Sequence, residues 1–478
     1  MLGDQLQQIL SSLSALSFEL GLVIGSFLLL IVGMVTSSRV AYKVVYVLVL
    51  LVGLFLVDFG IESELIVNQN LAINDLHAFL KALFVFSGIW IVFYPTAGKH
   101  RSEFYFLLLS VVVGSTFMLS ANNLLVIYLV VELTSFASYL LTNFNFEKKS
   151  FEASIKYLLF GGVSSALALY GASILFGYSG TLDLSLMDFG VVENDHFLNL
   201  GITLFVGGLL FKISIVPFHI WVPTTYEAAP TGAVAVLSIV PKVAGLVLLN
   251  NVLDSLHMMD QPWMVVMVAI LGMATIVIGT FGALQQTNVK RMIAYGAIAH
   301  SGFLLATLLI PFENGMSAFV WYSVVYALMN ITVFYLVALF ESKGLTTIEQ
   351  FAGLSSKESY LGGIVVVAMI ALVGLPPTSG FTIKFYLFTI MWEWCQSVGD
   401  PWVLSYLIVA VSSVVFSLFF YLKLPYFIFF KEGKNLNYSR SSLSQRIIAT
   451  IFTLLVLWLF FSPEILNNIA NNIKFLDW

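Results

Sequence analysis

Apolar runs long enough to cross a lipid bilayer follow one another along almost the entire chain, and the segments between them are too short to fold by themselves. A helix that crosses a bilayer needs about 20 mostly apolar residues, because the hydrocarbon core is roughly 30 Å thick. Of the 478 residues, 59% are hydrophobic and 10% are charged, which is far outside the composition of soluble domains. The pattern predicts an all-α polytopic membrane protein.

The limits of the apolar runs predict about fourteen transmembrane helices. These cover residues 17–36, 40–57, 76–96, 104–120, 122–142, 154–177, 199–222, 230–252, 262–283, 291–311, 316–340, 360–391, 402–424 and 446–461. Alternate connecting segments differ in charge: one set holds basic residues such as Arg39, Lys149 and Lys290, and the other holds mainly acidic ones such as Asp58 and Asp183. The positive-inside rule assigns the basic set to the cytoplasm, so we expect both termini outside.

Lys212 is an ionisable residue inside a predicted span, in the sequence LLFKISIVPFHIWVP (209–223). A charge near the bilayer centre costs roughly 2.5 to 3.5 kcal/mol on insertion scales, so we interpret it as functional. Pro217 and Pro223 should interrupt the same span, and broken helices in membranes line hydrated, protein-covered paths. Snorkelling of a lysine toward the headgroups is the alternative, but it suits span ends rather than a position beside a break.

Three further ionisable residues remain inside the predicted spans: Glu132, Lys242 and Lys384. Lys242 follows Pro241, and Lys384 follows a break predicted at the prolines of 376–377. Glu132 needs a partner, because an isolated buried carboxylate would take up a proton, and one of the lysines is the natural choice. Burial disfavours a charged lysine and a nearby carboxylate favours it, so such groups in series can relay protons.

Two other residues are possible members of the relay. His300 lies near the middle of its span, but a lone histidine in a membrane helix is more often a hydrogen-bonded structural group. Lys156 lies one or two turns inside the cytoplasmic boundary, where an anchoring role and a relay role fit equally well. Lys81 is interpreted as an anchor at the outer face.

The sequence contains no residue pattern typical of a cofactor site. Cys395 is the single cysteine, which excludes an iron–sulfur site built from this chain alone, and the six histidines are scattered. No Gly-rich phosphate loop or redox motif is present, and nothing indicates a metal site or nucleic-acid binding. We therefore expect no cofactor in this chain, lipid around it, and a partner that supplies the energy for transport.

The two predicted broken, lysine-bearing spans fall at matching places in the two halves of the chain. That arrangement predicts two inverted five-helix repeats containing broken helices. It divides the chain into three N-terminal transmembrane helices (1–103), a first antiporter-like repeat of spans 4 to 8 (104–252), a second, inverted repeat of spans 9 to 13 (253–424), and a cytoplasmic loop with the final transmembrane helix (425–478).

Four segments around these residues resemble, in order, the antiporter-like subunits of respiratory complex I, the proton-pumping NADH:quinone oxidoreductase. They are EASIKYLLFGGVSSALALYGASILFGYSGT (152–181), KISIVPFHIWVPTTYEAAPTGAVAVLSIVPKVAG (212–245), NVKRMIAYGAIAHSGF (288–303) and GLPPTSGFTIKFYLF (374–388). The similarity extends over nearly the whole chain. The first segment, and a lysine at position 384 in place of the glutamate of the subunit M pattern, are similar to the subunit N branch of the family.

The resemblance implies a fold, a function and a set of roles. In that family the carboxylate of span five pairs with the lysine of span seven, and a polar axis continues through span eight to span twelve, which here implies Glu132, Lys212, Lys242 and Lys384. It implies proton translocation in the membrane arm, driven by quinone reduction elsewhere, with NADH, FMN, iron–sulfur clusters and quinone in partner subunits. Expected neighbours are subunit M and small subunits such as K, in a bacterial inner (plasma) membrane with both termini periplasmic.

Two alternatives remain open from the sequence. A subunit of a multisubunit cation/proton antiporter or of a membrane-bound hydrogenase would use the same relay, although the glycine-rich sixth span favours complex I. A structural membrane subunit that binds quinone or lipid without moving protons would have no use for four buried ionisable groups. The identity of the neighbouring genes would distinguish these alternatives.

Overall fold

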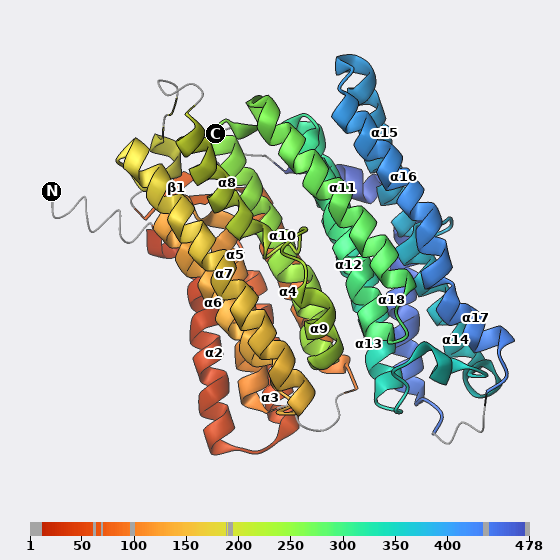
Figure 1. Ribbon diagram of the computed structural model, residues 1–478. Helices are drawn as coiled ribbons and strands as arrows, with labels where there is room; N and C mark the ends of the chain where they lie inside the picture. The colour runs from red at the N-terminus through yellow and green to blue at the C-terminus, as the bar shows by residue number, and fades with distance from the viewer. Residues whose placement is uncertain are drawn as a thin grey trace.

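The protein is a bundle of long helices that run roughly side by side (Figure 1). This computed structural model describes residues 12–60, 64–67, 70–95, 101–187, 189, 195–433 and 439–473. Within these ranges, twelve helices are long and apolar enough to cross a membrane. The all-α polytopic fold expected from the sequence is confirmed, and the number of about fourteen spans stays a prediction.

The described residues of the first half form two short strands and nine α-helices. They are α2 (Ser17–Val35), α3 (Arg39–Phe55), β1 (Glu64–Ile66), β2 (Leu71–Ile73), α4 (Asp75–Ile89) with the 3-10 turn η1 (Trp90–Phe93), α5 (Ser102–Ser120), α6 (Leu124–Thr142), α7 (Lys148–Ser179), η2 (Leu184–Leu186), α8 (His196–Leu210), α9 (Trp221–Ala228), α10 (Thr231–Ser255) and η3 (Met258–Asp260).

The described residues of the second half form helices joined by short connecting segments. The helices are α11 (Pro262–Leu284), α12 (Val289–Leu305), η4 (Ala306–Leu309), α13 (Phe312–Glu341), η5 (Ile348–Phe351), α14 (Ser355–Val373), α15 (Ser379–Val398), α16 (Pro401–Tyr421), α17 (Lys423–Phe430), α18 (Leu443–Phe461) and α19 (Glu464–Asn472).

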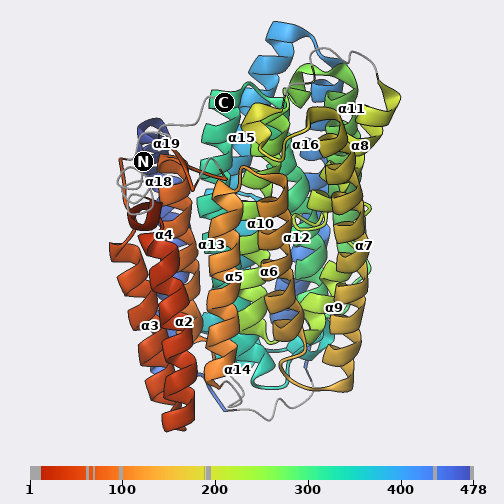
Figure 2. The same cartoon turned by 90° about the vertical axis from the view of Figure 1, so that its left-hand side faces the viewer.

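Three helices form the centre of the bundle. Helices α10, α12 and α13 are buried along almost their whole length, whereas α2, α7 and α18 are buried over a third of their span or less. Helix α5 packs against α6 and α10, and α11 packs against α12 and α16. Helices α2, α3 and α4 lie together at one side of the molecule (Figure 2).

Both predicted breaks are present, but their limits differ from those expected. Helix α8 ends at Leu210 and α9 begins at Trp221, so Pro217 lies in the gap. Pro223 lies inside α9 and does not interrupt it, because the first N–H groups of a helix have no intrahelical acceptor to lose. The second break covers residues 374–378 between α14 and α15. Helix α10 continues through Pro241 without interruption.

Charged residues from several predicted cytoplasmic segments meet at one end of the bundle. The side chains of Lys149 on α7 and Arg291 on α12 both contact the carboxylate of Glu227 at the end of α9, at 2.6 and 3.2 Å. These three residues come from both halves of the chain. We call this end the basic end, and the grouping agrees with the sorting of loops by charge.

The opposite end holds the acidic connections and the described β-strands. Strands β1 and β2 pair antiparallel in the connection between α3 and α4. Single backbone bridges join Leu71 to Ala121 and Asn123 to Asp183. These short pairings were not predicted, because the apolar pattern that marks the spans gives no information on how backbone groups outside them find partners.

Glycine lets α7 and α8 approach closely, which positions the break that follows α8. A methyl group at Gly171 would lie 2.4 Å from the backbone nitrogen of Phe205 and 2.6 Å from the carbonyl oxygen of Gly201.

We therefore expect Gly171→Ala to destabilise the subunit by about 1–3 kcal/mol, the usual range for overpacking. Gly177→Ala on the same helix is the control, because nothing lies within 4 Å of its methyl position. Equal thermal unfolding of the two variants in the purified complex would contradict this account.

Candidate functional site

Lys212 lies in the non-helical stretch between α8 and α9, deep in the protein. Its side chain is buried, and its ammonium nitrogen has no hydrogen-bond partner among the described residues. The hydroxyl of Ser214 is likewise buried and without a partner. Because buried polar groups in proteins nearly always have a partner, these atoms indicate a site for ordered water.

Neighbouring helices hold the break in place. The backbone N–H of Val216 donates to the Thr275 hydroxyl on α11 at 3.0 Å, and the Trp221 indole donates to the Phe211 carbonyl at 3.2 Å. Gly245 on α10 makes room for the stretch, since a methyl group there would lie 3.3 Å from Cβ of Lys212. The backbone groups freed by the break are therefore partly satisfied by protein.

Glu132 lies on α6 and is half-buried. It accepts a short hydrogen bond from the Ser165 hydroxyl on α7, and it forms no ion pair within 4 Å of Lys212. Ser165 and Phe211, the residue before Lys212, line the same small cavity, so the carboxylate lies near the break. This cavity of about 20 Å³ is also lined by Ser135 and has room for one water molecule. The predicted pair is thus close but not in direct contact.

Lys242 is buried on α10 and contacts α12. Its ammonium donates to the Ala297 carbonyl at 3.0 Å and to the Ser301 hydroxyl at 3.2 Å. It also lies 5.9 Å from the centre of the Tyr226 ring, and the Tyr226 hydroxyl is buried without a partner. Tyr226 belongs to α9, so this contact connects the first broken span to Lys242.

His300 follows on α12 and is buried. Its Nδ1 lies 2.6 Å from the Tyr322 hydroxyl on α13, and its ring centre lies 5.4 Å from that of Tyr326. The Tyr326 hydroxyl is another buried polar atom without a partner in the described chain. His300 is thus hydrogen-bonded, as the structural alternative expects. It also directly precedes Ser301, which binds Lys242, and it lines a small cavity together with Lys384.

Lys384 joins the two halves of the second broken span. Its ammonium donates to the carbonyls of Leu372 and Val373, at 3.1 and 2.8 Å, and thereby caps the C-terminal end of α14. Gly374 follows with φ +87°, and a methyl group there would lie 2.8 Å from Cδ of Lys384. A cavity of about 10 Å³ is lined by both Lys384 and His300, which makes these two residues neighbours.

Five of the six predicted site residues therefore follow one another through the interior. The order is Glu132, Lys212, Lys242, His300 and Lys384. Lys156 lies apart on α7, where its side chain is 48% exposed and forms an ion pair with Glu152 at 2.6 Å. Tyr226, Tyr322 and Ser301 belong to the series but could not be selected from the sequence, because tyrosine and serine occur in many helix contacts.

Lys81 is not the surface anchor predicted from the sequence. It is buried on α4, and its ammonium lies 2.8 Å from the carboxylate of Glu19 on α2, which is also buried. Glu19 lies in the first turn of its helix, where an acidic residue is ordinary. A pairing between helices far apart in the sequence gives no local signal, so neither residue could be recognised as one of a pair.

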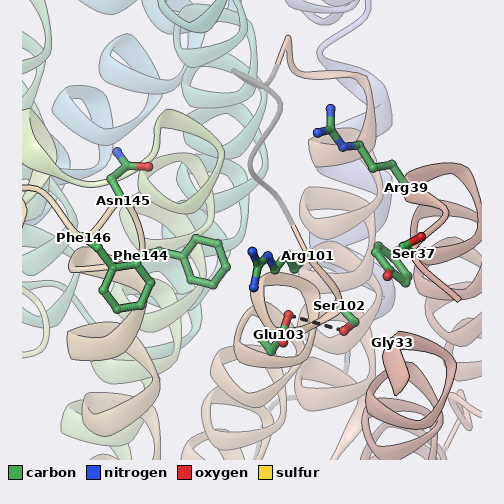
Figure 3. A pocket seen from close by; sticks show the side chains of 10 residues that line it. Gly33, Ser37, Arg39, Arg101, Ser102, Glu103, Phe144, Asn145 and Phe146 are labelled. Atoms are coloured by element: carbon green, nitrogen blue, oxygen red, sulfur yellow. Dashed lines mark hydrogen bonds between the residues drawn. The ribbon is translucent and has the colours of Figure 1, made fainter. Parts of the chain in front are cut away.

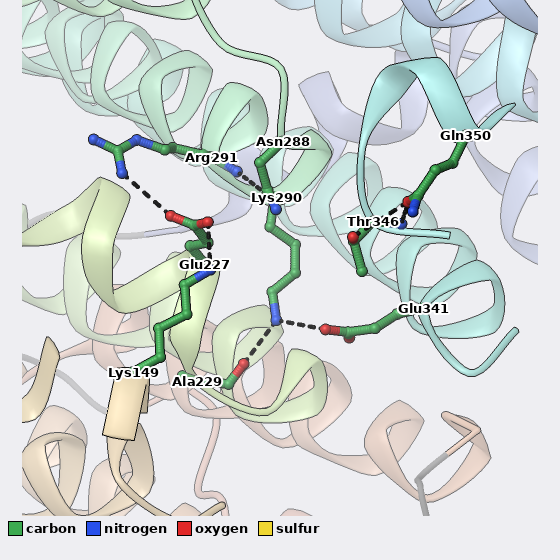
Figure 4. A network of polar contacts seen from close by, with 9 residues as sticks. All are labelled: Lys149, Glu227, Ala229, Asn288, Lys290, Arg291, Glu341, Thr346 and Gln350. Atoms are coloured by element: carbon green, nitrogen blue, oxygen red, sulfur yellow. Dashed lines mark hydrogen bonds and ion pairs between the residues drawn. The ribbon is translucent and has the colours of Figure 1, made fainter. Parts of the chain in front are cut away.

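A second feature missed from the sequence lies at the basic end. Lys290, assigned to a cytoplasmic loop, is buried and donates to the Ala229 carbonyl at 2.8 Å and to the Glu341 carboxylate at 3.1 Å (Figure 4). Glu341 also accepts a hydrogen bond from Thr231, the first residue of α10. A cavity of about 360 Å³ is lined by Glu227, Lys290 and Glu341. We call this cavity the basic-end vestibule.

Comparison with known proteins places this geometry among membrane transport subunits. Residues 121–432 match the family model described as "NADH:quinone oxidoreductase/Mrp antiporter, TM". The chain is 30% identical over 452 residues to NADH-quinone oxidoreductase subunit N of Pelagibacter ubique, covering 92% of this chain and 94% of the relative. It is 37% identical to NADH-quinone oxidoreductase subunit N 2 of Rhizobium meliloti, covering 70% and 69%.

A solved structure shows the same arrangement of helices. A chain of respiratory complex I from Thermus thermophilus, solved with bound Aureothin, superposes with a TM-score of 0.76 at 26% identity. The match covers 94% of this chain and 97% of that one. The similarity therefore extends over most of the chain.

Proposed function

Since the chain belongs to the family of membrane subunits shared by NADH:quinone oxidoreductases and Mrp antiporters, we propose that it translocates protons as subunit N in the membrane arm of an NADH:quinone oxidoreductase. The relatives named above carry that subunit name, and the solved neighbour is a respiratory complex I. The observation that supports proton transport in this chain is the buried series from Glu132 to Lys384.

In this proposal the series acts as a proton relay. Lys212, Lys242 and Lys384 hold and release protons in turn, and His300 connects the last two. Ordered water completes the path, because the ammonium of Lys212 and the hydroxyls of Tyr226 and Tyr326 have no protein partner in the described chain. Lys156 takes the anchoring role, since its exposed ion pair keeps it outside the series.

Glu132 acts as the switch. Its carboxylate is held by Ser165 here, and a movement toward Lys212 would stabilise the charged ammonium there. Moving one charge against 100 mV costs about 2.3 kcal/mol, and one pKa unit corresponds to about 1.36 kcal/mol. A change of under two pKa units at one site therefore supplies enough free energy to move one proton against 100 mV. A rearranged ion pair in a membrane interior can produce a change of that size.

The energy comes from partner subunits. The one cysteine, Cys395, cannot hold an iron–sulfur cluster alone, so NADH, FMN, the clusters and quinone are assigned to other subunits. We assign subunit M and small subunits such as K as neighbours, and no redox step to this chain. The basic end faces the cytoplasm across a bacterial inner membrane, and both termini are periplasmic.

Protons enter through the basic-end vestibule. Glu341 is partly exposed to the vestibule, whereas its partner Lys290 is buried, so the pair connects solvent with the interior. Lys290 also binds the Ala229 carbonyl, which directly follows α9 and is close in sequence to Tyr226. This placement gives a path from the vestibule past Tyr226 to Lys242.

The substitution Glu341→Gln tests proton transport at the proposed entrance of the path. The amide keeps the shape of the side chain but cannot exchange a proton at physiological pH, so NADH-driven proton uptake by reconstituted vesicles should fall to well below half of the wild-type rate. Glu349→Gln is the control, an exposed carboxylate on the neighbouring η5 turn. Equal proton uptake by the two assembled variants would contradict an entrance at Glu341.

A further inference from the structure

A separate cavity of about 870 Å³ opens at the basic end, where α2 ends and α3 and α5 begin (Figure 3). Its lining includes Ser37 after α2, Arg39 at the start of α3, Arg101 before α5, and Phe146 from the connection between α6 and α7. Gly33 brings the end of α2 against α5, because a methyl group there would lie 1.9 Å from the Ser102 hydroxyl. The cavity thus lies where the three N-terminal helices meet the rest of the bundle, and its volume is in the range of ligand sites.

Arg39 and Arg101 differ from the other cations of this end. Among the described residues, neither guanidinium lies within 4 Å of a carboxylate. Glu103 lines the same cavity, but its carboxylate is bound by the Ser102 hydroxyl at 3.4 Å. In contrast, several basic side chains at the same end lie within 3.2 Å of a carboxylate, namely Lys149, Lys290, Arg291, Lys343 and Arg446. The cavity therefore combines two available guanidinium groups with open space.

Large apolar side chains surround the cavity. Phe144 and Phe146 form the wall opposite Arg39, and the Arg101 side chain lies between them and Arg39 (Figure 3). Phe146 is 83% exposed, and the last residues of α2, Met34 and Val35, are 88% and 82% exposed. Basic groups at a helix end beside exposed apolar side chains match a molecule with an anionic head and apolar tails.

We propose that this cavity binds the headgroup of an anionic phospholipid, with the phosphate on Arg39 and Arg101 and the acyl chains along the exposed end of α2. A guanidinium binds phosphate oxygens through two parallel N–H donors, so arginine suits this ligand better than lysine. The bound lipid would join the start of α3 to the start of α5 across the cavity that both line.

The test uses the complete complex in vesicles that contain a trace of photoactivatable phosphatidylglycerol, with labelling located on the peptides of this subunit. Each arginine near an anionic lipid is worth about 1 kcal/mol, or about fivefold, so Arg39→Gln with Arg101→Gln should lower labelling near residues 101–103 and 144–146 by roughly tenfold or more. Arg440→Gln is the control, an exposed arginine at the same end.

Unchanged labelling in the double variant would overturn the proposal. Loss of labelling on addition of excess inorganic phosphate alone would assign the site to free phosphate rather than to lipid. If the double variant does not assemble, the wild-type complex decides: photoactivatable phosphatidylcholine should label these peptides several-fold less than the phosphatidylglycerol probe. Equal labelling by the two probes would show that the arginines do not select an anionic headgroup.

Discussion

Lys212→Ala is expected to reduce proton pumping strongly and to slow coupled quinone reduction while the complex still assembles. The ammonium of Lys212 has no hydrogen-bond partner in the described chain, so its removal breaks no protein hydrogen bond. Lys212→Met fills the space more completely and should behave in the same way. Because a positioned proton donor or acceptor is typically worth a factor of 100 or more, pumping should fall by roughly a hundredfold.

The measurement is NADH-driven proton uptake by vesicles that contain the purified complex, together with the rate of quinone reduction. Lys156→Met is the matched control, since that lysine is half-exposed and paired with Glu152 on the surface of the same half. Glu132→Gln should have a smaller effect than either Lys212 variant, because the carboxylate tunes the lysine and does not carry the proton. Wild-type pumping by an assembled Lys212→Ala complex would exclude Lys212 from the relay.

Lys384→Arg is expected to reduce pumping nearly as much as Lys384→Ala. Arginine can keep the charge and donate to the Leu372 and Val373 carbonyls, but it does not release its proton at any physiological pH. If Lys384 only fixes α15 to α14, arginine should restore function that alanine loses. If Lys384 must lose its proton in every cycle, both variants should lower pumping by roughly a hundredfold.

Assembly and pumping must be measured separately for this pair. Lys384→Ala removes two hydrogen bonds to the end of α14 and should lower thermal stability by about 1–3 kcal/mol, whereas Lys384→Arg should recover much of that loss. A complex that is stabilised by arginine and still fails to pump would support the relay. Full pumping by an assembled Lys384→Arg complex would leave Lys384 with a purely electrostatic role.

The sequence contained most of what determines the fold. Each span is specified by a local property, namely its own apolar length, and both broken spans contain proline beside a buried lysine. Lys212, Lys242 and Lys384 could be found because a charge inside an apolar run is costly enough to be conspicuous. The exact ends of the breaks could not be found, since Pro223 lies where a helix tolerates proline and Gly374 ends α14 through a backbone angle.

The contacts between distant residues were beyond the sequence. Nothing in the sequence distinguishes Ser165 from the other small residues of its helix, yet its hydroxyl binds Glu132. Lys81 and Lys290 lie near the ends of apolar runs, where lysine usually extends toward the headgroups, and only the fold supplies Glu19 and Glu341 as their partners. His300 had two interpretations: the structure shows its hydrogen bond to Tyr322, which the structural role expects, and the relay role stays a prediction.

The hydrogen bonds of Lys384 couple its protonation to the rigidity of the second broken span. The chain between α14 and α15 is interrupted at residues 374–378, so the side chain of Lys384 spans the joint between two separate rods. A charged donor makes hydrogen bonds about twice as strong as a neutral one. The joint is therefore stiffer while Lys384 holds its proton. Each release of that proton should briefly loosen the hinge and let α15 tilt against its neighbours.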